Sequence, residues 1–118
     1  MVKDIIEKFP NQKKRQKDFK CSLGFAMTVI GSKWRAIVLW HILKGQPIRY
    51  GQLKKSIPSI SHKILAQELK YLESDGLIER IAYATIPPRV EYISTDRGKS
   101  LEHVLTELCI WGRKYMEK

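Results

Sequence analysis

Apolar residues between positions 22 and 75 recur every three or four residues, the period of a helix with one buried face. The pattern predicts helices over residues 23–30, 33–44, 50–56 and 62–75. The segment 33–44 has the densest apolar stripe, and we expect it to form the spine of the core. Pro58 is expected to end the short helix 50–56, after a few extended residues from Pro47.

Serines and glycines mark the expected ends of these helices. Ser22, Ser32 and Ser61 are candidate N-caps, because a serine hydroxyl can accept from a free backbone N–H of the first turn. Gly45 and Gly76 are candidate terminators in the left-handed conformation that glycine adopts readily. Three of the four predicted helices thus have a capping residue, which supports the assignment.

After Gly76 the apolar period shortens towards two, which favours strands. Residues 77–83 and 90–93 are predicted to pair as a hairpin around the proline-containing turn 85–88. A last helix is expected from Asp96, as N-cap, to the C-terminus. Its apolar positions repeat every three or four residues: Leu101, Val104, Leu105, Leu108, Trp111 and Tyr115.

The 62–75 helix has two chemically different faces. Its inward stripe consists of Ile64, Leu65, Leu69 and Leu72. Its outward face, together with the cap, consists of Ser61, His62, Lys63, Ala66, Gln67 and Lys70. A short helix, a turn, a longer helix with a polar outer face and a hairpin follow one another as in a winged helix-turn-helix. The predicted fold class is mainly α with a small β-hairpin wing.

Charge points to a polyanionic partner. The 118 residues carry 22 Lys and Arg against 12 Asp and Glu, a formal net charge of +10. Apolar runs are shorter than the roughly 20 residues of a spanning helix, and the first 20 residues lack the apolar centre of a signal peptide. We therefore expect a cytoplasmic protein without membrane association. Residues 1–20 are interpreted as a basic arm or short helix, and 21–118 as one domain.

Double-stranded DNA is the polyanion that this pattern fits. Gln67 can pair with adenine, Lys63 can donate to guanine or phosphate, and Ala66 permits close approach or contact with a thymine methyl. Arg89, beside two prolines, is a candidate for the minor groove. The candidate phosphate contacts are Lys33, Arg49, Lys54 and Lys55.

The same residues allow other interpretations. Basic residues on a helix often form only a solvated face, and a non-specific DNA-coating protein would use the same charge. An adaptor for other proteins would leave the net charge unexplained. We find no phosphate-binding glycine loop, nucleophile elbow, paired carboxylates or metal-ligand spacing, so we expect no catalysis, metal or cofactor.

The chain from Cys21 to Tyr115 resembles the HxlR-type regulators, a bacterial branch near the MarR family. The motifs that carry the resemblance are Cys21, Ile30-Gly31-Ser32-Lys33-Trp34, Arg49-Tyr50-Gly51-Gln52-Leu53, Ile60-Ser61, Leu65, Leu69, Leu72-Glu73, Asp75-Gly76-Leu77-Ile78, Pro87-Pro88-Arg89-Val90-Glu91-Tyr92 and Trp111-Gly112. Two positions on the reading face differ from the usual family residues: His62 replaces a frequent proline, and Ala66 a frequent threonine. The operator therefore cannot be inferred from relatives.

The resemblance implies a homodimer that binds a near-palindromic operator and controls transcription by blocking or, less often, assisting polymerase. Its terminal helices would form the interface, with these residues: Leu23, Phe25, Leu101, Val104, Leu105, Leu108, Trp111 and Tyr115.

Cys21 matches the position that some family members use to sense oxidants or electrophiles. The neighbouring Lys20 and a helix N-terminus both favour the reactive thiolate. The alternative is that Cys21 is merely a small packed residue. Cys109 is expected to be buried in the last helix. An interprotomer disulfide between Cys109 and Cys21 is the alternative that stays open. A small-molecule effector is likewise left open.

Overall fold

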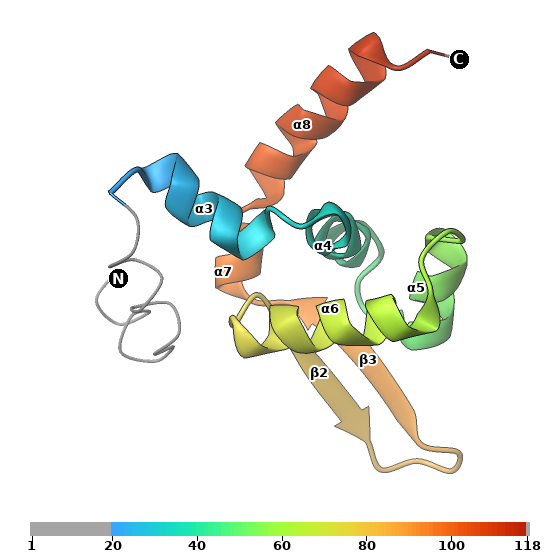
Figure 1. Ribbon diagram of the computed structural model, residues 1–118. Coiled ribbons are helices and arrows are strands. Elements are labelled where there is room, and N and C mark those ends of the chain that lie inside the picture. Colours follow the sequence, from blue (N-terminus) through green and yellow to red (C-terminus); the bar gives the residue numbers. More distant parts are fainter. Residues whose placement is uncertain (1–19, 118) are drawn as a thin grey trace.

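The computed structural model describes residues 20–117 (Figure 1). The interpretation of residues 1–19 as a basic arm therefore lies outside the described residues. The elements are, in chain order, α3 (Ser22–Ile30), α4 (Lys33–Gly45), β1 (Ile48–Arg49), α5 (Tyr50–Ser56), α6 (His62–Ser74), β2 (Ile78–Tyr83), β3 (Arg89–Ser94), α7 (Asp96–Lys99) and α8 (Glu102–Tyr115).

Helix α4 is the centre of the core, as its apolar stripe predicts. Val38, Leu39 and Ile42 are completely buried on it. Helix α6 crosses α4 and contributes Leu65 and Leu72, which are also completely buried. These contacts turn the apolar face of α6 inward and leave its other face to the solvent.

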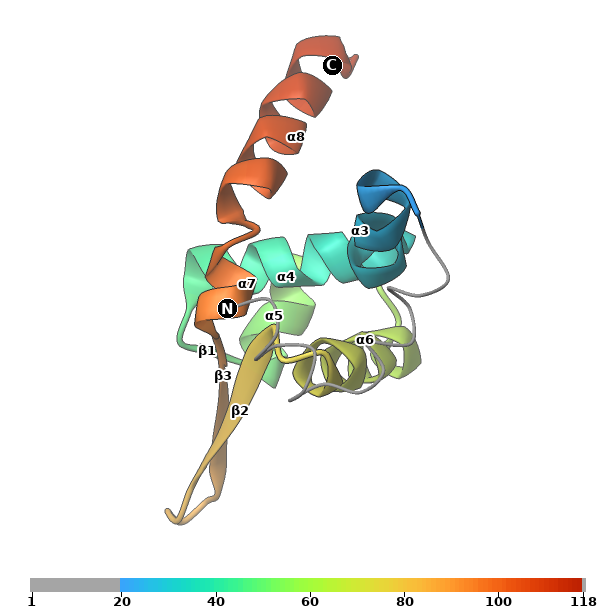
Figure 2. The same cartoon turned by 90° about the vertical axis from the view of Figure 1, so that its left-hand side faces the viewer.

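The described residues contain one antiparallel sheet with strand order β1-β3-β2. The β2–β3 pairing confirms the predicted hairpin. Strand β1 lies in the few extended residues that the sequence predicts from Pro47, but its pairing with β3 was not predicted. Ile48 of β1 lies opposite Tyr92 of β3. The side chain of Gln46 secures this edge, because its Oε1 accepts from the Ser94 N–H at 2.7 Å and from the Ser94 hydroxyl at 2.9 Å. The hairpin extends from one side of the body (Figures 1 and 2).

Two of the three predicted serine caps are confirmed. The Arg35 N–H donates to the Ser32 hydroxyl at 3.2 Å, and the Ile64 N–H donates to the Ser61 hydroxyl at 3.1 Å. The assignment of Ser22 as a cap was wrong. Helix α3 already includes Ser22, and its N-cap residue is Cys21, whose side chain makes no capping hydrogen bond.

The two glycine terminators have different outcomes. Gly76 has a φ of 73°, as predicted for the end of α6. Gly45 does not adopt the left-handed conformation; it belongs to α4, and Gln46 follows with extended backbone. Pro47 is the physical reason, because a proline disfavours helical backbone at the residue before it, which is Gln46 here. The chain therefore passes directly from α4 into β1.

The last predicted helix is divided into α7 and α8, and the assignment of Asp96 as N-cap was wrong. Thr95 is the cap of α7, and its hydroxyl accepts from the Gly98 N–H at 3.1 Å. The break at residues 100–101 turns α8 away from the body, on the side opposite the hairpin (Figure 2). Leu105 anchors its first turn in the core and is 5% exposed. The observed order of elements is that of the predicted winged helix-turn-helix, in which α5 and α6 form the helix pair and β2–β3 the wing.

The close approach of α7 to the start of β2 requires glycine at position 98. A Cβ there would overlap the Leu77 carbonyl oxygen, whereas a Cβ at Gly51 in α5 would meet nothing within 4 Å. We expect Gly98→Ala to lower the free energy of unfolding by about 2 kcal/mol or more. Gly51→Ala, the matched control, should leave it unchanged or raise it by up to about 1 kcal/mol. Urea denaturation of both variants measures this, and equal effects would contradict the packing constraint.

Candidate nucleic-acid interface

The predicted reading face of α6 is accessible along its length. Opposite the buried leucines, the helix and its cap expose Ser61, His62, Lys63, Ala66, Gln67 and Lys70. Ile64, predicted on the inward stripe, is only partly buried against the core. The exposed side chains are polar, small or cationic, which are the properties that a helix needs to enter the major groove. Arg49 and Lys55 on the preceding elements are also exposed.

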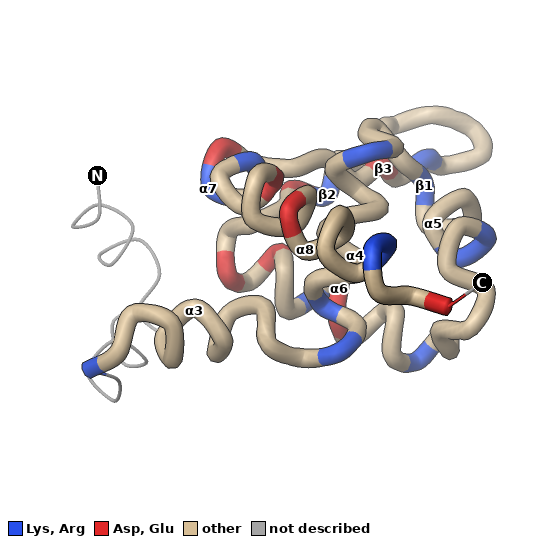
Figure 3. Tube along the Cα trace, turned by 90° about the horizontal axis from the view of Figure 1, so that it is seen from above, with Lys and Arg blue, Asp and Glu red and all other residues tan. Residues whose placement is uncertain are grey.

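The chain next to this face is free of acidic residues. From Arg49 to Gln67 it carries four basic residues and no Asp or Glu. The tube of α5 is accordingly blue and tan without red (Figure 3). Lys54 is partly buried and its Nζ donates to the Pro58 carbonyl at 3.4 Å. Lys55 is therefore the more available cation on α5. Together these residues make a locally positive surface that favours phosphate.

Tyr50 joins the beginning of α5 to the beginning of α6. Its hydroxyl lies 2.9 Å from Nδ1 of His62 and 3.3 Å from the His62 carbonyl oxygen. The two rings stack, with centroids 5.8 Å apart. The sequence prediction placed His62 on the reading face but gave Tyr50 no role, because residues twelve apart show no periodic relation that would signal contact.

A nearly buried ion pair holds the middle of α6. Arg35 is 9% exposed, and its Nε donates to Glu68 Oε2 at 2.9 Å. Its Nη1 also donates to the Val29 carbonyl on α3 at 3.2 Å, and its guanidinium lies over the ring of Tyr71. One side chain of α4 thus contacts α3 and α6. Arg35 was not among the residues predicted from the sequence, although a signal existed: it occupies a position of the buried stripe of α4.

The wing holds its Arg89 side chain against the neighbouring strand. The Arg89 guanidinium stacks over Tyr83 on the paired strand, 4.0 Å from the ring centroid. Its Nε is buried without a hydrogen-bond partner among the described residues. The tip is instead apolar, with Ile86 fully exposed, and the Thr85 hydroxyl donates to the Pro87 carbonyl at 2.9 Å. Lys33 lies elsewhere, in the first turn of α4 beside the Trp34 ring.

An apolar strip runs along α8. We define it as Val104, Leu108, Trp111 and Tyr115, which are 45% to 65% exposed. The Trp111 and Tyr115 rings are in contact, with centroids 5.0 Å apart. Other predicted interface residues divide between surface and core. Leu23 is exposed, Phe25 and Leu101 are partly buried, and Leu105 lies in the core of its own chain.

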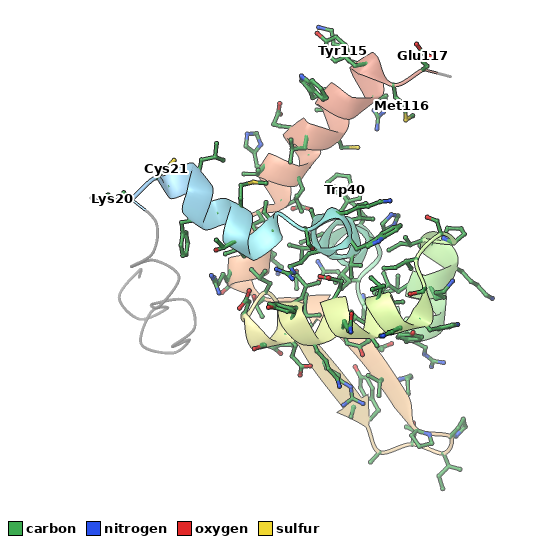
Figure 4. The ribbon with its side chains drawn as sticks, in the orientation of Figure 1. Lys20, Cys21, Trp40, Tyr115, Met116 and Glu117 are labelled. Carbon is green, nitrogen blue, oxygen red and sulfur yellow. The ribbon has the colours of Figure 1, made fainter. Side chains whose placement is uncertain are left out.

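The cysteines lie at different places in the fold, Cys21 as the N-cap residue of α3 and Cys109 within α8. Cys21 is exposed at the outer end of α3 (Figure 4). Cys109 is partly buried on α8, where Arg113 Nη2 lies 3.8 Å from its sulfur. Both are free thiols. Cys21 therefore has the accessibility that a reactive thiol needs.

The sequence of this chain is similar to those of known helix-turn-helix proteins. A family model described as HxlR-like helix-turn-helix matches residues 29–118. The HTH-type transcriptional regulator YkvN of Bacillus subtilis (strain 168) is 45% identical over 102 residues, which cover 86% of each chain. No helix among residues 20–117 is long and apolar enough to cross a membrane.

Solved structures show the same fold. A protein described as a MarR-family transcriptional regulator of Porphyromonas gingivalis W83 aligns with a TM-score of 0.78 and 36% identity, over 82% of this chain and 94% of that one. The redox regulator HypR in its oxidized form aligns with a TM-score of 0.78 and 34% identity, over 83% of this chain and 100% of that one.

Family, relatives and fold therefore agree that this chain is a regulator of transcription with a helix-turn-helix, and not an enzyme. They confirm the expected resemblance and fold class. The protein belongs to the HxlR-like helix-turn-helix family of transcriptional regulators.

Proposed function

We propose that the chain is a homodimeric repressor that binds a near-palindromic operator in double-stranded DNA. The observation that carries this proposal is the exposed face of α6, whose side chains are polar, small or cationic while its opposite face is buried. Repression requires only that the bound protein occupies DNA that polymerase must enter. The proposal places the protein in the cytoplasm, with the DNA.

The residues of the surface divide into reading and positioning contacts. Gln67 offers an amide that pairs with the edge of adenine, and Lys63 offers a donor for guanine or phosphate. Ala66 leaves room for close approach, and Lys70 extends the cationic face along the next turn. Arg49 and Lys55 contact phosphates, which orient the protein without specifying sequence. Arg89, held against Tyr83, supports the wing in or beside the minor groove.

The second copy is proposed to pack on the α8 strip and on Leu23 of α3. An exposed row of large apolar side chains is unfavourable in water, and α8 extends from the body, which leaves the row open to a partner. A single reading helix contacts one half-site. A two-fold symmetric dimer supplies the second helix, as a near-palindromic operator requires.

Cys21 is proposed to make DNA binding sensitive to oxidants. It is exposed at the beginning of α3, and Arg35 connects the far end of α3 to Glu68 on α6. A displacement of α3 on oxidation would therefore act on the reading helix through Arg35. The redox regulator HypR, which shares this fold, is consistent with such a role.

Substitutions on α6 and α5 test the division between reading and positioning. Gln67→Ala is expected to cost about 1 to 3 kcal/mol of binding free energy on an operator that the protein selects from a random DNA pool, and little on random DNA. Lys55→Ala should weaken binding to the operator and to random DNA equally. It should also reduce the number of counterions released on binding by about one, which is measured as a shallower salt dependence. Fluorescence anisotropy with operator and competitor DNA measures both, with Lys99→Ala on α7 as a control. Equal losses on both DNAs for Gln67→Ala would contradict base reading.

A charged residue in the α8 strip tests the dimer. Trp111→Glu would place like charges in the interface of both copies, so we expect monomers where the wild-type protein is dimeric. Lys114→Glu on the same helix is the matched control and should remain dimeric. Analytical ultracentrifugation measures the mass at several concentrations. A Trp111→Glu protein that stays dimeric would show that the interface lies elsewhere.

Treatment with diamide tests the thiol. Diamide accepts two electrons and two protons from a pair of thiols, which join as a disulfide. We expect operator affinity to change by about 5-fold or more, the usual range of coupling between sites. Cys21→Ser should abolish the response, and Cys109→Ser tells whether Cys109 is the second thiol. If wild-type affinity is unchanged by diamide, Cys21 has no sensing role.

A further inference from the structure

We propose that Tyr50 is a positioning residue that determines how His62 meets DNA. The Tyr50 hydroxyl lies on the Nδ1 side of the imidazole, so that Nε2 is the ring nitrogen that meets DNA. His62 then contacts a backbone phosphate through Nε2, in its doubly protonated form. The inference rests on the proposed function, because it assigns a specific role to one side chain of the α6 reading face.

The two contacts of the Tyr50 hydroxyl favour one placement of the hydrogens. The oxygen is 2.9 Å from Nδ1 of His62 and 3.3 Å from the His62 carbonyl oxygen. A phenol has only one hydrogen to donate. The hydroxyl makes two separate hydrogen bonds when Tyr50 donates to the carbonyl and accepts from Nδ1–H, whereas donation to Nδ1 would leave the carbonyl at best a share of the same hydrogen. The arrangement therefore favours the forms of His62 that carry a hydrogen on Nδ1.

Two forms of the imidazole meet this condition. In the neutral form, Nε2 has a lone pair and can only accept a hydrogen bond. In the imidazolium form, Nε2–H is a donor. Phosphate oxygens offer only acceptors, so a phosphate beside His62 selects the imidazolium. The stacked ring of Tyr50 holds the imidazole in place for this contact.

The charges around His62 indicate that the counter-charge comes from DNA. On its own helix the neighbouring charged residue is Lys63, and β1 and α5 contribute Arg49, Lys54 and Lys55. Helix α4, which packs against α6, contributes Arg35. The nearest carboxylate along α6 is Glu68, which is paired with Arg35. No acidic residue lies between positions 49 and 67 to balance the imidazolium. His62 is therefore expected to gain a proton as the phosphate arrives.

The pH dependence of operator affinity tests this at fixed salt. Between pH 8 and pH 6, wild-type affinity should increase by about tenfold or more, as expected when each subunit gains most of a proton on binding. His62→Gln should remove this slope. Tyr50→Phe, which keeps the ring but lacks the hydroxyl, should reduce it and weaken binding most at pH 6. A wild-type slope in either variant would overturn the proposal.

The other two histidines of the chain provide matched controls. His103 is exposed on α8, and His41 is partly buried in α4, where burial lowers its pKa. His103→Gln and His41→Gln should both keep the slope. If one of them removes it, the proton is taken up there and the proposal is wrong.

A second measurement needs no DNA. Nitrogen-15 NMR of the imidazole at pH 8 should show that His62 carries its hydrogen on Nδ1. In Tyr50→Phe the population of the tautomer with the hydrogen on Nε2 should increase. A wild-type ring with the hydrogen on Nε2 would overturn the proposal. Specific binding without a pH slope would also overturn it while leaving the proposed function intact. Absence of specific binding at every pH would overturn the proposed function, and this inference with it.

Discussion

The burial of one face of α6 against α4 is the constraint on which the rest of the structure depends. Leu65 and Leu72 are completely buried, and each contributes on the order of 1.5 to 3 kcal/mol relative to exposure. Because successive helical residues are about 100° apart, fixing these leucines fixes every other side chain of α6. The outward direction of Gln67 and Lys63 is thus a consequence of core packing.

Apolar burial is not directional, so it determines which face of α6 points inward but sets the exact position of the helix along and around its axis only approximately. Directional contacts supply that information. Arg35 holds Glu68 near the middle of the helix, and Tyr50 holds His62 at its beginning. A hydrogen bond tolerates little misalignment, so these two contacts fix the helix more narrowly than the leucines do. The same contacts connect α6 to α3 and α5, through which other parts of the chain can act on DNA binding.

Local signals predicted much of this architecture. The apolar stripe of α4, the serine caps of α4 and α6, the left-handed Gly76 and the hairpin all depend on residues close together in sequence. The errors have local and distant causes: the N-caps of α3 and α7 lie one residue before the predicted ones, Gly45 depends on its neighbour Pro47, and the break after α7 involves a distant segment. Gly45 stays helical because Pro47 and β1 take over the turn, and the division between α7 and α8 accompanies the contact of Gly98 with Leu77.

The candidate site was predictable to the same extent. The exposed face of α6 follows from the period of its own residues. Arg35 and Tyr50 were missed because their partners lie 33 and 12 residues away, and a periodic pattern carries no information about such pairs. The stacking of Arg89 on Tyr83 was missed for a related reason, since it depends on the exact register of the hairpin.

The central claim is that the exposed face of α6 lies in the major groove, once in each half of a dimer. Methylation interference tests it most directly, on DNA selected by the protein from a random pool. Methyl groups on guanine N7, which lies in the major groove, should block binding in two clusters centred about one helical turn apart. Binding that is indifferent to N7 methylation throughout the selected site would contradict the account.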